Sequence, residues 1–98
     1  MAFAIELSAR ARANLQRLRK RDQQIIMDTI DAQLTHQPMT PTSRRKKLQE
    51  NPFAPWELRI GSFRVFYDVI ADDEKVVVLA VGHKVHNVLW IGDEVLEL

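Results

Sequence analysis

Residues 56–69 read WELRIGSFRVFYDV, and this stretch decides the fold. Hydrophobic and polar side chains alternate on both sides of Gly61-Ser62, which is the pattern of two half-buried strands. A two-residue connection with glycine first is typical of a type II′ hairpin turn. One face of the predicted hairpin carries Trp56, Leu58, Ile60, Phe63, Val65, Tyr67 and Val69, and the other carries Glu57, Arg59, Arg64, Phe66, Asp68 and Ile70. We expect the first face to lie in the core, with Tyr67 buried and Trp56 packed against helices.

The residues after the hairpin predict one buried strand and a short strand pair. Residues 76–81 are all apolar, as in a strand covered on both faces, so we place this strand inside the sheet. We expect Gly82-His83-Lys84 to end it. Residues 85–98 are predicted to contain two short strands rather than a helix, because Gly92 interrupts the helical pattern.

Before the hairpin, the pattern predicts a short strand and two helices. Residues 3–7 alternate as a half-buried strand does, and Ser8 stands where a helix N-cap belongs. Apolar residues then recur at helical spacing, which predicts a first helix. A break is expected before Asp22, which is the expected N-cap of a second helix. That helix should end by Gln37, because the residue before a proline disfavours the helical conformation. Residues 38–55 are predicted to be an exposed loop, with at most a helical turn at the basic end.

The composition fits a single domain that spans residues 1–98. The chain is 46% hydrophobic and 28% charged and has no cysteine, which excludes a disulfide framework, a cysteine-containing zinc site and thiol catalysis. The longest apolar run, residues 76–81, is far short of the roughly 20 residues that cross a membrane, and no signal peptide is recognisable. We therefore expect a cytoplasmic protein with no membrane partner.

The net charge of +1 conceals an uneven distribution. Residues 1–50 carry ten Lys and Arg against five Asp and Glu, whereas residues 51–98 carry four against eight. The basic half is a weak indication of a polyanionic partner, since solvated helix faces give the same pattern more often.

The hairpin and its surroundings resemble the RelE/ParE superfamily of bacterial type II toxins. The similarity covers residues 44–86 and is carried by the basic run at 44–47, Leu58-Arg59, Phe63-Arg64-Val65, Tyr67, an acidic turn and an apolar strand that leads into Val81-Gly82-His83-Lys84. The resemblance implies an α+β fold of order β-α-α-β-β-β, in which a helical hairpin packs on one side of a mostly antiparallel sheet. It also implies a partner antitoxin whose C-terminal segment wraps the toxin and neutralises it.

The two branches of the superfamily have different activities. The RelE branch cleaves mRNA in the ribosomal A site, whereas the ParE branch inhibits DNA gyrase and is not a nuclease. We favour the RelE-like hypothesis, a ribosome-associated and metal-independent mRNA endoribonuclease without a cofactor. The alternative is a non-catalytic binding module of the same fold, either a ParE-like gyrase inhibitor or a member that has lost toxicity.

RNA cleavage by the ribose 2′-hydroxyl needs a base, cations around the phosphorane and an acid for the leaving 5′-oxygen. Arg64 matches the arginine that binds the scissile phosphate in nuclease relatives. Its guanidinium group is planar and permanently charged, and it can donate two parallel hydrogen bonds to a phosphate. Its structural alternative is an ion pair with Asp68 or Glu57. Nuclease relatives carry lysines on the first hairpin strand, where the nearest residue here is Glu57, and this reversal of charge argues against a lysine-based mechanism.

The resemblance supplies the other candidates. His83 and His86 are the expected acid or base, because a histidine near the C-terminus has this role in some nuclease relatives. Lys84 stands where RelE nucleases usually have arginine, and Trp90 where they have tyrosine; an indole stacks on a base but has no hydroxyl. The predicted RNA-binding residues are Lys46, Lys47, Arg59, Lys84 and Trp90.

Each of these candidates has a structural alternative. The basic run is equally compatible with an ordinary solvated surface, and for the two histidines a surface position without a role is the more common case. Arg59 also fits an ion pair with a neighbouring carboxylate, and Trp90 fits a core position or a surface that faces the antitoxin.

Overall fold

The computed structural model describes residues 2–96, which form two helices, a short 3₁₀ turn and a seven-stranded sheet. This α+β architecture is the predicted one. In chain order the elements are β1 (Ala4–Leu7), α1 (Ala9–Gln16), α2 (Lys20–Leu34), β2 (Arg45–Lys47), β3 (Trp56–Ile60), β4 (Phe63–Ile70), η1 (Ala71–Asp73), β5 (Lys75–Val85), β6 (Val88–Ile91) and β7 (Glu94–Leu96). No helix within residues 2–96 has the length and apolar character to cross a membrane.

The long strand β5 organises the sheet, whose order is β2-β3-β4-β5-β6-β7 with every neighbouring pair antiparallel. One edge of β5 pairs with β4, and the other edge is shared between β1, which is parallel to it, and β6. Helix α1 covers the backbone between β1 and β6: Ser8 Oγ donates to the Leu79 carbonyl at 2.9 Å, and the Val81 N–H donates to Asn14 Oδ1 at 3.0 Å. The apolar residues 76–81 therefore lie inside the sheet, as predicted.

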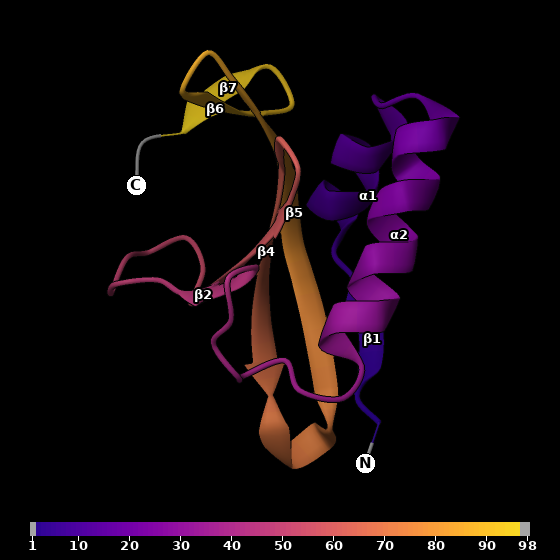
Figure 1. Ribbon diagram of the computed structural model, residues 1–98, viewed down its shortest axis with the longest axis vertical. Helices are drawn as coiled ribbons and strands as arrows, with labels where there is room; N and C mark the ends of the chain where they lie inside the picture. The colour runs from indigo at the N-terminus through magenta and orange to yellow at the C-terminus, as the bar shows by residue number, and fades with distance from the viewer. Residues whose placement is uncertain (1, 97–98) are drawn as a thin grey trace.

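Both helices cover one face of the sheet and form the main core with it (Figure 1). Trp56 and Tyr67 are buried there, as expected, with their rings stacked at 6.0 Å between centroids. The Tyr67 hydroxyl donates to the Pro38 carbonyl at 2.7 Å, so the polar end of the ring is satisfied inside the core. The fully buried residues of this core include Ala11, Ile26, Ile30, Leu34, Leu58, Val65, Val76 and Val78.

The opposite face of the sheet carries a smaller core. Phe66 and Ala80 are buried on this face under the loop of residues 48–55 and under the hairpin of β6 and β7. Figure 1 shows both coverings on the side of the sheet away from the helices. The two coverings leave part of this face accessible, and that part holds the candidate site.

The boundary between the helices differs from the prediction. Ser8 is the N-cap of α1, as expected, and its Oγ accepts from the Ala11 N–H at 3.0 Å. Helix α2, however, begins at Lys20 with Arg19 as N-cap, so the predicted N-cap role of Asp22 is wrong. Asp22 instead lies in the first turn of α2, where a carboxylate is favourable beside the positive end of the helix dipole.

The basic run is a strand, which corrects the prediction of a loop through residues 38–55. β2 pairs with β3 and alternates across the sheet, so Lys46 faces away from the helices. Arg45 is buried, and its guanidinium donates to the carbonyls of Gln33 at 2.5 Å and Thr40 at 2.9 Å. These carbonyl acceptors allow a cation to lie within a segment that composition alone marks as exposed.

The end of β5 also differs from the prediction, because the strand continues through Gly82-His83-Lys84 to Val85. A Cβ on Gly82 would lie 2.9 Å from the carbonyl oxygen of Trp90, so glycine permits the close approach of β6 rather than ending the strand. The predicted hairpin turn is confirmed, with Gly61 at φ +58°. The predicted strand pair in the tail is confirmed as β6 and β7, while residues 97 and 98 lie outside the described part.

Candidate functional site

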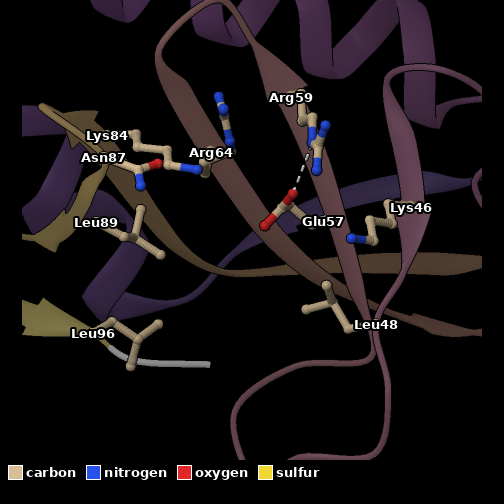
Figure 2. Close-up of a pocket in the computed structure, with 9 residues that line it drawn as sticks. All are labelled: Lys46, Leu48, Glu57, Arg59, Arg64, Lys84, Asn87, Leu89 and Leu96. Atoms are coloured by element: carbon tan, nitrogen blue, oxygen red, sulfur yellow. Dashed lines mark hydrogen bonds and ion pairs between the residues drawn. The ribbon is translucent and has the colours of Figure 1, made fainter.

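A hollow of about 480 Å³ opens on the sheet face opposite the helices. Its floor comes from β2, β3, β4 and β5, and its walls come from the loop after β2 and from β6 and β7 (Figure 2). We call it the cationic hollow. The nine residues that line it are Lys46, Leu48, Glu57, Arg59, Arg64, Lys84, Asn87, Leu89 and Leu96.

Strand register brings the charged residues together. Lys46 is opposite Glu57 across β2 and β3, and Arg59 is opposite Arg64 across β3 and β4. Arg64 is in turn opposite Gly82 on β5, and Lys84 follows two residues later on the same face. Four cations from four strands thus share one face, and all four are site residues predicted from the sequence.

One ion pair forms within the cationic hollow. Arg59 Nε donates to Glu57 Oε1 at 3.1 Å, which confirms that Arg59 pairs with a neighbouring carboxylate. Within residues 2–96, Lys46, Arg64 and Lys84 form no ion pair. The lining therefore holds an excess of positive charge, with most of it available to an anion from solvent.

Arg64 is held by backbone groups rather than by a carboxylate. Its Nη1 donates to the carbonyl of Gly61 at 2.7 Å and to that of Phe63 at 2.9 Å. The alternative ion pairs with Asp68 and Glu57 do not form, and Asp68 instead accepts from the Val69 N–H at 2.7 Å. The hairpin thereby orients the guanidinium and leaves Nε and Nη2 without partners among residues 2–96, so these groups can donate to a phosphate.

His83 and Trp90 lie on the other face of the sheet. They are opposite each other across β5 and β6 and line a second hollow of about 220 Å³ beside α1. The His83 ring stacks on Phe63 at 4.5 Å between centroids, and its Nε2 is 2.9 Å from Ser62 Oγ. The sheet therefore separates His83 from Arg64. His86 is exposed in the turn between β5 and β6 and lines neither hollow.

Lys47 also lies apart from the cationic hollow. It is on the helix-side face of β2, with its Nζ 5.6 Å from the centroid of the Trp56 ring. The neighbouring residues Lys46 and Lys47 thus project to opposite faces of the sheet.

Several lining residues were not predicted. Glu57 was recognised as a charge reversal but not as part of the site, although its alternation with Leu58 was a sufficient signal for its face. Asn87, Leu89 and Leu96 come from the last two strands and the turn before them, and no local pattern indicates that this tail folds back over the sheet. Within residues 2–96, no three His, Asp or Glu side chains gather as a metal site would require.

Comparisons with known proteins agree with this architecture. The family described as ParE toxin of type II toxin-antitoxin system, parDE, matches residues 5–87. The toxin–antitoxin complex RelBE2 from Mycobacterium tuberculosis contains a chain of similar fold, with TM-score 0.74 and 22% identity over 85% of this chain and 92% of that chain. The archaeal RelE–RelB complex from Pyrococcus horikoshii OT3 gives TM-score 0.66 and 22% identity over 83% and 93%. Curated proteins gave no significant match.

The family match extends from β1 to the turn after β5 and so includes the hairpin and both helices. It covers well over half of the chain, and the two solved structures share the fold across nearly their whole length. The chain therefore belongs to the ParE toxin family of type II toxin–antitoxin systems, within the RelE/ParE superfamily.

Proposed function

We propose that this toxin is an mRNA endoribonuclease that acts at the ribosome and is neutralised by a cognate antitoxin. The observation that carries the proposal is the cationic hollow, in which Lys46, Arg64 and Lys84 share one open face without ion pairs among residues 2–96. Both solved structures of similar fold are toxin–antitoxin complexes, which supports an antitoxin partner.

The lining residues suit a strand of RNA. Arg64 donates its free N–H groups to the scissile phosphate, and charge-assisted hydrogen bonds of this kind are about twice as strong as neutral ones. Lys84 and Lys46 lie on either side of it and counter the charge of the phosphorane and of the adjoining phosphates. A hollow this open holds little of its substrate, so the ribosome supplies the positioning of the RNA.

The proposal is tested by producing the toxin without its antitoxin and mapping mRNA 5′ ends. We expect cuts in translated mRNA that require ribosomes, and a loss of about 100-fold or more in cleavage by Arg64→Ala, since one donor to a developing anion contributes about that much. Arg12→Ala, an exposed arginine on α1, is the matched control and should cleave like the wild type. Intact mRNA together with full toxicity would contradict the proposal.

The second candidate is a gyrase-inhibiting binding module. It is favoured by the separation of His83 from Arg64 and by the presence of Glu57 among the cations, because both depart from the nuclease pattern. The same experiment distinguishes the two candidates: a gyrase inhibitor causes DNA damage while mRNA stays intact. A chain without any effect on growth fits neither activity and points to a member that has lost toxicity.

A further inference from the structure

Glu57 is the one group of the nine that line the cationic hollow able to accept a proton at neutral pH. The other lining residues are four cations, one amide and three leucines. His83 lies across the sheet, and His86 is outside the hollow. If RNA is cleaved against Arg64, the base for the 2′-hydroxyl must come from this face.

The geometry presents one oxygen of Glu57 to the hollow. Oε1 accepts from Arg59 Nε at 3.1 Å, while Oε2 forms no hydrogen bond with residues 2–96. In Figure 2 the second oxygen points away from Arg59 into the open space on the side of Leu89. The Glu57 side chain is 10% exposed and so is largely shielded from solvent, and the hydrogen bond from Arg59 holds the carboxylate through Oε1.

A purely structural role accounts poorly for this position. Arg59 is 46% exposed, and an ion pair with an exposed arginine contributes at most about 1 kcal/mol. A carboxylate also lowers the affinity of a cationic surface for phosphate, so its presence opposite Lys46 weakens binding. A catalytic role explains why a carboxylate that weakens phosphate binding is present at this position.

We infer that Glu57 is the general base of the RNA cleavage; this rests on the proposed function. Oε2 takes the proton of the ribose 2′-hydroxyl while the 2′-oxygen attacks the phosphorus held by Arg64. The O2′–P bond forms and the P–O5′ bond breaks, which leaves a 2′,3′-cyclic phosphate. The departing 5′-oxygen takes a proton from solvent water, and Glu57 later returns its own proton to solvent. Arg59 is a positioning residue that fixes Oε1.

The test compares Glu57→Gln with the wild type in single-turnover cleavage of mRNA on programmed ribosomes. We expect cleavage to slow by about 100- to 10,000-fold, the usual contribution of a general base. Glutamine is isosteric and still accepts from Arg59. Affinity for an RNA with 2′-deoxyribose at the cleaved position should therefore stay equal or increase. Glu94→Gln, the same change at an exposed position on β7, should leave both quantities unchanged.

A second variant tests proton transfer directly. Glu57→Ala removes the base and leaves space, so added formate or acetate should restore part of the cleavage, with the more basic carboxylate more effective. The inference is wrong if the wild type cleaves and Glu57→Gln cleaves within threefold of it. It is equally wrong if affinity falls in proportion to cleavage, since Glu57 would then only position Arg59. A wild-type protein that leaves ribosomal mRNA uncut overturns the proposed function and this inference together.

Discussion

Tyr67 shows what a single buried hydroxyl contributes to this fold. Its ring lies in the main core, and its O–H donates to the carbonyl of fully buried Pro38 at 2.7 Å. Tyr67→Phe leaves that carbonyl without a partner, so the free energy of unfolding should fall by about 1–2 kcal/mol while the fold is kept. Urea unfolding followed by tryptophan fluorescence measures the loss. Equal stability of the two proteins would show that the hydrogen bond makes no net contribution to the free energy of unfolding.

The difference in stability between the wild type and Tyr67→Phe should also depend on pH. Burial raises the pKa of Tyr67 in the folded protein, while the nearby Arg45 lowers it by less. In the unfolded chain the phenol ionises near pH 10, so the folded state retains a proton that the unfolded state loses. The stability advantage of the wild type over Tyr67→Phe should therefore be constant below about pH 9 and narrow as the pH rises above about 10. A constant difference up to alkaline pH would contradict this assignment.

At the level of residues, alternation in the hairpin predicted the faces correctly. Trp56 and Tyr67 are buried, and Arg59 and Arg64 lie together on the opposite face. Local pattern could not predict that Arg45 is buried, because its acceptors are carbonyls of Gln33 and Thr40, one of them twelve residues away in sequence. Partners of this kind are defined by the tertiary fold.

Among the elements, a bulge in β5 decides which residues join the site. Phe66 pairs with Ala80 while Tyr67 pairs with Val78, so Leu79 is an extra residue on β5. The extra residue reverses the alternation after it, because side chains change face with a period of two. Lys84 therefore joins Arg64, and His83 faces α1. The sequence marked both residues as candidates, but no pattern in the uniformly apolar residues 76–81 reveals the bulge.

The close approach of β5 and β6 depends on Gly82. A Cβ there would lie 2.9 Å from the Trp90 carbonyl oxygen and 3.0 Å from a methyl group of Leu89, so Gly82→Ala must displace β6. We expect a loss of about 1–3 kcal/mol in the free energy of unfolding. Amide hydrogen exchange in β6 and β7 should also become faster than in the wild type, by more than it does in β3.

Gly61→Ala is the control for that prediction. Gly61 has φ +58°, but a Cβ added to it would have no atom within 4 Å, so the change strains only the hairpin turn and should cost about 1 kcal/mol. Exchange in β6 should then stay at the wild-type rate. Equal exchange in Gly82→Ala and the wild type would show that β6 adjusts without loss.

For the molecule as a whole, the two faces of the sheet matter more than the net charge of +1. The helices cover one face with the main core, and the accessible part of the other face holds the cationic hollow (Figure 1). The charge difference between the halves of the sequence does not describe this arrangement, because Lys46 from the first half meets Arg64 and Lys84 from the second. Only the strand pairing brings these cations together.

Lys46 and Lys47 allow a test of the proposal that RNA binds on the face of the cationic hollow. They are adjacent and carry the same charge, but Lys46 lines the cationic hollow while Lys47 lies over the Trp56 ring on the helix side. Each phosphate contact contributes about 0.7 to the slope of log affinity against log salt for single strands. With a non-cleavable 2′-O-methyl RNA, Lys46→Ala should therefore lower the magnitude of the slope by about 0.7, and Lys47→Ala should leave it unchanged. Equal slopes for the two variants would show that RNA does not bind preferentially at the cationic hollow. On a diffuse basic surface, loss of either lysine would change the slope by the same amount.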